Sequence, residues 1–190
     1  MQIYELNKDK VLQVSGSFVY VGEIDGKLYV KGENLSEPFI SSSLPQSLQD
    51  MLNAELEAAR KEKEKELNAK CDELLKSFTS NALGESYIYD MSVEDQLNLM
   101  ALATSKADSY FRCHKAGEPK ANIPHTSAQL KKVYADGIKY KSDTIYACGV
   151  LKAYLLTLED IEQIKALQWE DYERIIKTQN KASLENEAAL

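Results

Sequence analysis

The sequence predicts an α+β protein, mainly α, with a small N-terminal β-hairpin unit, one long and partly charged helix, and a C-terminal helical block that carries a small hairpin or looped arm. Two observations support this prediction. Residues 45–80 contain no Gly and only one Pro, Pro45 at the start, among good helix formers. Residues 1–44 instead carry β-branched and aromatic runs around a turn. We therefore expect four segments, at 1–44, 45–80, 81–179 and a frayed tail at 180–190.

The N-terminal 44 residues predict two or three short strands. The runs 18–21 and 27–30 flank Asp25-Gly26, a dipeptide typical of tight hairpin turns. Residues 11–16 alternate as a further candidate strand. Because so few strands bury little apolar surface alone, we expect this unit to pack on the rest of the chain, on a second copy or on a partner.

The stretch 45–80 predicts one long helix. Three serines and then Pro45 precede it, and Pro suits the first turn because its missing N–H is not needed there. Apolar residues recur three or four positions apart along one stripe. The stripe residues that could form an oligomer seam are Leu48, Leu52, Leu56, Leu67, Leu74 and Phe78.

A charged run interrupts this stripe. Residues 60–66 read R-K-E-K-E-K-E, and burying such charges without partners costs several kcal/mol. We expect the middle of the helix to be solvated on all sides, with Glu–Lys pairs three or four residues apart. One interpretation is a spacer between two packed ends. The other is a coiled coil in an oligomer.

In the C-terminal block the sequence predicts three helices, each with a cap at its N-terminus. The caps are Ser92 with Asp95, the capping box of Thr126 with Gln129, and the run Thr157 to Asp160. A hairpin or looped arm is expected at 110–125, with a turn at 116–119. The residues expected to be buried on the first two helices are Leu97, Met100, Leu102 and Ala103, then Leu130, Val133, Tyr134, Ile138, Ile145, Cys148, Leu151 and Leu155.

Composition narrows the classes of partner. The net charge is −7 and the pI about 5.0, which argues against nucleic acid and anionic membranes, since both require clustered Lys and Arg. No apolar run has the length of a membrane helix, and the first residues do not resemble a signal peptide. Cys71, Cys113 and Cys148 are odd in number and far apart, which favours reduced thiols in a cytosolic protein.

No motif predicts catalysis or a cofactor. Phosphate-binding glycine loops and zinc-ligand spacings are absent from the sequence. Cys113 and His114 are neighbours, so on a strand they would point to opposite faces and share a metal poorly. A nucleophilic pair of Cys113 and His125 is formally open, because such pairs meet only in the fold. We expect no catalytic, cofactor-binding or metal-binding residues.

Tyrosine is the notable excess, with 11 Tyr against 4 Phe and 1 Trp. Tyrosine offers a large contact area with a polar tip, which suits protein interfaces. Half-buried packing explains most of them. The better candidates for partner contact lie on the non-helical segments and are Tyr87, Tyr89, Tyr110 and Phe111.

The second half of the chain carries a family pattern. Its parts are Leu83-Gly84 before Tyr87-Ile88-Tyr89, a helix with Asp95 to Leu99, the loop Tyr110 to Cys113, the run Pro124 to Leu130, Leu151 to Tyr154, and Thr157 to Ile161 with Trp169. Together they resemble an uncharacterised helical domain of tailed-phage and prophage proteins, which accompanies tail-fibre genes in proteins described as tail-fibre assembly proteins or chaperones. The most specific piece is the His-Thr-x-x-Gln-Leu run that His125 opens, which adds His125 to the candidate partner-binding residues.

The resemblance implies a non-enzymatic tail-fibre assembly factor that binds the fibre protein in the bacterial cytoplasm. Fibre subunits are rich in strands whose edges stay exposed until assembly, and exposed edges aggregate. The alternative is a structural tail or virion subunit, which would dock through its β-rich N-terminus and oligomerise through the long helix. An enzyme that uses Cys113 and His125, or a metal, is a third hypothesis.

Overall fold

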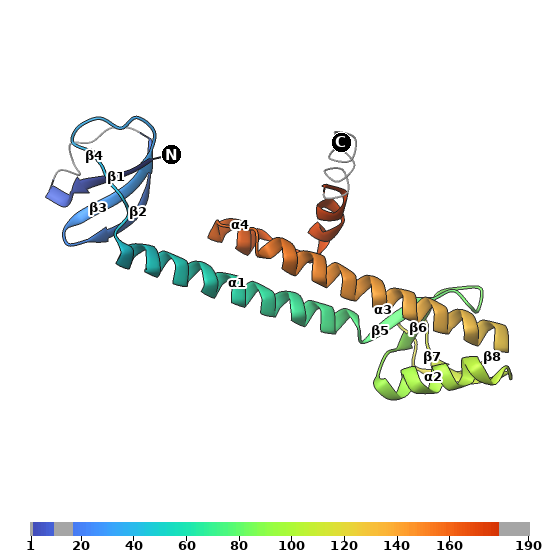
Figure 1. Cartoon of the computed structure of the whole chain (residues 1–190). Coiled ribbons are helices and arrows are strands. Elements are labelled where there is room, and N and C mark those ends of the chain that lie inside the picture. Colours follow the sequence, from blue (N-terminus) through green and yellow to red (C-terminus); the bar gives the residue numbers. More distant parts are fainter. Residues whose placement is uncertain (1, 10–16, 179–190) are drawn as a thin grey trace, which may run out of the picture. The chain divides into compact units, whose positions relative to one another are not determined.

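A computed structural model describes residues 2–9 and 17–178 and confirms the α+β class. The chain divides into two compact units, residues 1–59 and residues 60–190. The boundary falls inside the long helix α1 (Gln46–Leu74), so the two units share the helix that was predicted as a separate segment (Figure 1). The predicted strand at 11–16 and the predicted tail at 180–190 lie outside the described residues.

The first unit contains one antiparallel sheet in the order β2-β3-β1-β4. Its strands are β1 (Gln2–Asn7), β2 (Phe18–Ile24), β3 (Lys27–Gly32) and β4 (Ile40–Ser41). The predicted hairpin is confirmed: Ile24 pairs with Lys27, and Asp25 and Gly26 between them have φ of 51° and 73°. Such positive φ values belong to tight hairpin turns. One face of the sheet buries Tyr4, Leu6, Val30 and Phe39.

The first turn of α1 packs closely against this sheet. The helix starts at Gln46, directly after Pro45, as predicted. Leu48 is fully buried, and a Cβ at Gly22 in β2 would lie only 2.5 Å from its Cδ1 atom. Gly22 therefore allows the helix to approach the strand closely.

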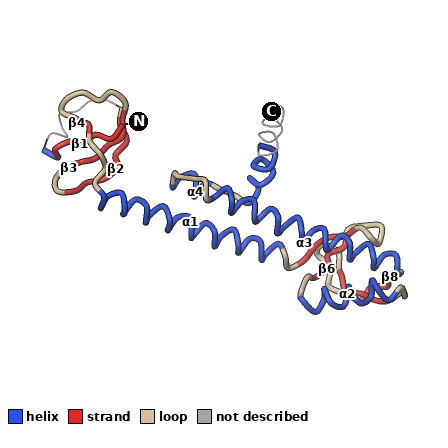
Figure 2. The backbone as a smooth tube through the Cα atoms, viewed as in Figure 1, coloured by secondary structure: helices blue, strands red, loops and turns tan. Residues whose placement is uncertain are grey.

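The second unit places two hairpins among helices, as Figure 2 shows by colour. β5 (Ser77–Ser80) pairs with β6 (Tyr87–Asp90), and β7 (Ser109–Cys113) pairs with β8 (Ala121–His125), which confirms the hairpin predicted at 110–125. Two backbone hydrogen bonds between Ile88 and His114, of 2.8 and 3.2 Å, join the hairpins. The helices are α2 (Val93–Ser105), α3 (Ser127–Leu155), α4 (Ile161–Ala166), the short 3-10 helix η2 (Trp169–Asp171) and a helical stretch at 172–178.

The end of the long helix was predicted wrongly. α1 ends at Leu74 instead of residue 80, and Phe78 from the predicted stripe lies in strand β5. Along β5 the side chains of Phe78 and Ser80 are buried while that of Thr79 is exposed, which is the period of a strand. Ser, Phe and Thr have only modest helix propensity, so pairing with β6 decides the structure of this segment.

The charged run of α1 is not solvated on all sides, contrary to the prediction. The Arg60 guanidinium donates a hydrogen bond of 2.7 Å to the Leu158 carbonyl, and Lys63 is only 8% exposed while its ammonium pairs with Glu66. Lys152 of α3 reaches Glu64 across a 3.2 Å ion pair. Figure 1 shows this half of α1 lying alongside α3. Long cationic side chains permit such packing because their methylene stems can be buried while the charge stays paired.

Two predicted caps are confirmed and one is moved. The Ser92 hydroxyl accepts from the Asp95 N–H at 3.0 Å and starts α2, and Thr126 and Gln129 form the reciprocal capping box of α3. α4 is capped by Asp160 itself, whose carboxylate accepts from two backbone N–H groups, rather than by Thr157. An N-terminal carboxylate also interacts favourably with the helix dipole, which suits Asp at this position.

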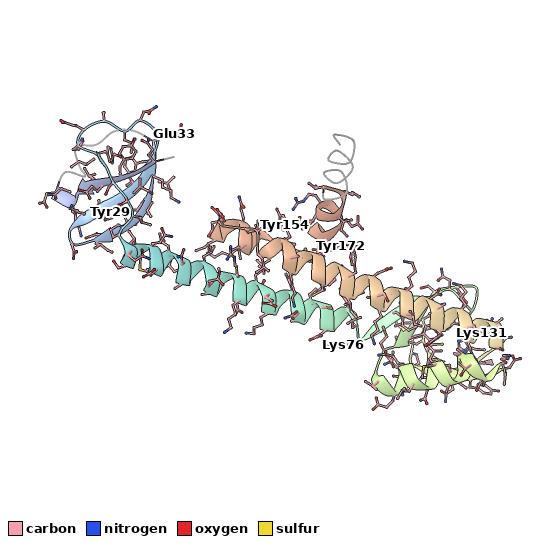
Figure 3. The ribbon with its side chains drawn as sticks, in the orientation of Figure 1. Tyr29, Glu33, Lys76, Lys131, Tyr154 and Tyr172 are labelled. Carbon is pink, nitrogen blue, oxygen red and sulfur yellow. The ribbon has the colours of Figure 1, made fainter. Side chains whose placement is uncertain are left out.

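The core of the second unit is built on stacked aromatic rings. Phe78 stacks on Tyr89 at 5.5 Å, and Tyr89 stacks on Phe111 at 6.2 Å between ring centroids. Leu130 and Val133 of α3 are fully buried in the same cluster. Gly137 allows α3 to approach the rings, since a Cβ there would lie 2.8 Å from the Phe78 ring. Side chains fill the space between α3, the hairpins and α2 near the labelled Lys131 (Figure 3).

The two glycines of α3 give a matched test of this close approach. We expect Gly137→Val to destabilise the protein by about 1–3 kcal/mol, because the added atoms must displace the Phe78 ring. A Cβ at Gly149 would project into open space, so Gly149→Ala should stabilise the helix by up to about 1 kcal/mol. Urea unfolding followed by circular dichroism measures both, and an unchanged or raised stability of Gly137→Val would contradict the packing described.

Candidate interaction groove

Several helix residues expected in the core are exposed instead. On α2 the buried residues are Leu99 and Ala103, whereas Leu97 and Met100 are 55% and 42% exposed. On α3 Leu130, Val133, Cys148, Leu151 and Leu155 are buried as predicted, but Ile138 and Ile145 are about half exposed. The prediction of burial is therefore wrong for four large apolar residues: Leu97, Met100, Ile138 and Ile145.

Three of these four residues line one groove between α2 and α3. Leu97 and Met100 come from α2 and Ile138 from α3, and the groove encloses about 240 Å³. Its other apolar lining comes from the core side. Those residues are Phe78, Met91, Leu99, Tyr134 and Gly137.

The polar groups at the groove are already paired. The Lys141 ammonium donates to the Gln96 side-chain oxygen at 2.8 Å, and the Gln96 amide donates to the Met91 carbonyl at 2.7 Å. Asp90 accepts two hydrogen bonds from Lys120, at 2.7 and 2.8 Å. These charges and amides already have hydrogen-bond partners. Apolar side chains that enter the groove would therefore not leave a buried polar group without a partner.

The groove suits the binding of apolar side chains from another protein. Monomeric proteins rarely leave several large apolar residues adjacent on the surface, and such patches with polar rims mark interaction sites. Val93, Leu97 and Met100 stand four and three residues apart on α2, so one helix face carries them all. That spacing is the sequence pattern that could have identified the groove, but it is also the spacing of a core stripe.

The residues predicted for partner contact divide into buried and accessible ones. Tyr89, Phe111 and His125 are 0%, 6% and 2% exposed, so these three lie in the core of the second unit and present almost no surface to a partner. They form the centre of the core because alternate strand residues point inward. Tyr87 is half-buried and Tyr110 is 66% exposed, and their role in partner contact stays a prediction.

The candidate seam residues of the long helix pack within the chain. Leu48 is buried in the first unit, and Leu52 and Leu56 are half-buried. In the second unit Leu67 is buried and Leu74 half-buried. The most buried members of the stripe therefore offer little surface for a coiled coil between copies.

Cys113 and His125 do meet, through Tyr89. His125 Nδ1 donates to the Ile123 carbonyl at 2.8 Å, and Nε2 pairs with the Tyr89 hydroxyl at 3.0 Å. The Cys113 thiol contacts the same hydroxyl. Burial raises the pKa of the Cys113 thiol and that of the Tyr89 phenol. A raised thiol pKa disfavours the thiolate, which is the nucleophilic form, so this cluster is better suited to packing than to catalysis.

Among the described residues, no group of three or more His, Cys, Asp or Glu is placed to hold a metal ion. Within that same part of the chain, no helix is both long and apolar enough to cross a membrane. Comparisons with protein-family models, with curated proteins and with solved structures gave no match to this chain.

The buried hydrogen bond between Tyr89 and His125 can be tested by removing one hydroxyl. We expect Tyr89→Phe to lower the free energy of unfolding by about 1–3 kcal/mol, because His125 Nε2 then remains buried without a hydrogen-bond partner. Tyr110→Phe, on the exposed side of the neighbouring hairpin, should change it by less than about 0.5 kcal/mol. Equal effects in urea unfolding would contradict the assignment.

Proposed function

We propose that this protein is a non-enzymatic tail-fibre assembly factor of a tailed phage or prophage, which binds the fibre protein in the bacterial cytoplasm. The observation that carries the binding role is the apolar groove between α2 and α3, with Leu97, Met100 and Ile138 exposed in it. The choice of the fibre protein as partner rests on the sequence pattern of residues 83–169.

The chemistry of the groove is consistent with this role. An unassembled fibre chain presents apolar side chains that its trimer will later bury, and these are hazards for aggregation while they remain exposed. A groove with apolar walls and a paired polar rim can cover such side chains reversibly. The net charge of −7 keeps the factor soluble during that contact.

The structural-subunit alternative has less support. It requires the long helix to associate between copies, whereas Leu48 and Leu67 of its stripe are buried within the chain. Analysis of purified phage particles separates the two functions, because a structural subunit is retained in the particle and an assembly factor is released.

The proposed function can be tested by co-expression. We expect the protein to raise the yield of soluble, trimeric fibre when both are made together, measured by size-exclusion chromatography with light scattering. The double variant Leu97→Glu with Ile138→Glu should lose this effect, because two carboxylates in the groove must be desolvated by any apolar ligand. Its affinity for the fibre should fall at least about tenfold, equivalent to about 1.4 kcal/mol.

The matched control is Leu156→Glu. Leu156 is 70% exposed at the end of α3 and does not line the groove, so its variant carries a similar change at a neutral site. Fibre that stays insoluble with the wild-type protein would overturn the proposed function. Loss of activity in Leu156→Glu to the same extent as in the double variant would remove the groove as the binding site.

A further inference from the structure

Two of the three cysteines, far apart in the sequence, face each other in the second unit. Cys71 lies on α1 and Cys148 on α3, and the two thiols are close enough for Cys148 to raise the pKa of the Cys71 thiol. Asn68, one turn before Cys71, lies 4.0 Å from the Cys148 sulfur through its side-chain oxygen. The same oxygen accepts a 3.2 Å hydrogen bond from Lys152, one turn after Cys148.

The surroundings hold the two thiols in this arrangement. Both cysteines are buried, at 8% and 7% exposure, and Leu67 and Leu151 one turn away are buried as well. The ion pair of Lys152 with Glu64 ties the same two helices together. The two thiols thus lie buried between α1 and α3 and not on exposed segments.

We propose that Cys71 and Cys148 form an oxidative modification site, at which a small peroxide converts the two thiols into an intramolecular disulfide that links α1 to α3. The proposal does not rest on the proposed function. It also differs from the expectation of three independent reduced thiols.

The reaction balances with hydrogen peroxide as the oxidant. One thiolate attacks a peroxide oxygen, the O–O bond breaks, and a sulfenic acid and hydroxide form. The second thiol then attacks the sulfenic sulfur, so the S–S bond forms and the oxygen leaves as water. In total two thiols lose two electrons and two protons, and one peroxide is reduced to two waters.

The surroundings of the Cys71 thiol determine the rate of this reaction. Burial, and next the neighbouring Cys148, raise the pKa of the Cys71 thiol to about 11, while the Lys152 ammonium acts in the opposite direction. The thiolate is the reactive form, so below that pKa its fraction rises about tenfold per pH unit. The site should therefore be slow at neutral pH and respond to sustained, not brief, peroxide exposure.

The disulfide would hold α1 and α3 together. It would close a loop that contains both hairpins and α2, and cross-links that close long loops restrict the unfolded chain most. We expect the oxidised protein to unfold at a higher temperature than the reduced one, and the difference to disappear on adding a reductant.

The experiment uses the full-length protein, treated with hydrogen peroxide at pH 8.5, unfolded in an alkylating agent and analysed by mass spectrometry. The expected result is a monomer with one alkylated cysteine, Cys113, where the reduced protein carries three, and a peptide that joins Cys71 to Cys148 and is about 2 Da lighter than the sum of its two reduced parts. The rate should increase between pH 7 and pH 9. A map without the Cys71–Cys148 peptide, or with cross-links only between chains, would overturn the proposal.

The variants provide the matched controls. Cys71→Ser and Cys148→Ser should each lose the cross-link and the rise in Tm, whereas Cys113→Ser should keep both, because Cys113 lies beside Tyr89 in the other part of the core. The peptide map of the wild-type protein decides the question even where a variant fails to fold. A cross-link of Cys113 to either partner would also count against the assignment.

Discussion

The close approach of α3 to strand β5 is the constraint on which the second unit depends. Gly137 leaves room for the Phe78 ring, and that ring begins the stack that continues through Tyr89 and Phe111. With α3 close to the hairpins, α2 buries Leu99 and Ala103, and Leu102 packs partly buried against the same core. Among the described residues, no other element covers the exposed apolar face of α2 beside α3. This uncovered face forms the groove.

Local features of the fold could be predicted from the sequence, because they depend on residues three or four positions apart. The capping box of Thr126 and Gln129, the cap of α2 and the turn at Asp25-Gly26 all belong to this class. Helix boundaries could not be predicted where pairing with a strand distant in the sequence decides them. Residues 77–80 continue the stretch without Gly or Pro, yet pairing with the strand 87–90 makes them part of a hairpin.

The side of a helix that faces the core was the hardest feature to predict. Leu97 and Leu99 are both apolar, and only the tertiary partner decides that Leu99 is buried and Leu97 exposed. The prediction for the charged run of α1 failed for a related reason. Spacing places Lys63 on the apolar stripe and only its charge suggested a solvated position, but its stem lies in the helix contact while Glu66 pairs its ammonium. For the candidate site, the residue types were visible in the sequence and their exposure was not.

The groove also limits how a fibre chain could be bound. The backbone N–H and C=O groups along α2 and α3 are bonded within their helices, so these two walls of the groove offer no partners for the edge of a strand. In the proposed complex, affinity would come from apolar side chains and their fit, because Lys141 and Asp90 at the rim are already paired. An assembly factor acting through this groove would therefore hold the side chains of the fibre and leave its strand edges free to find each other, which is what the pairing of three chains requires.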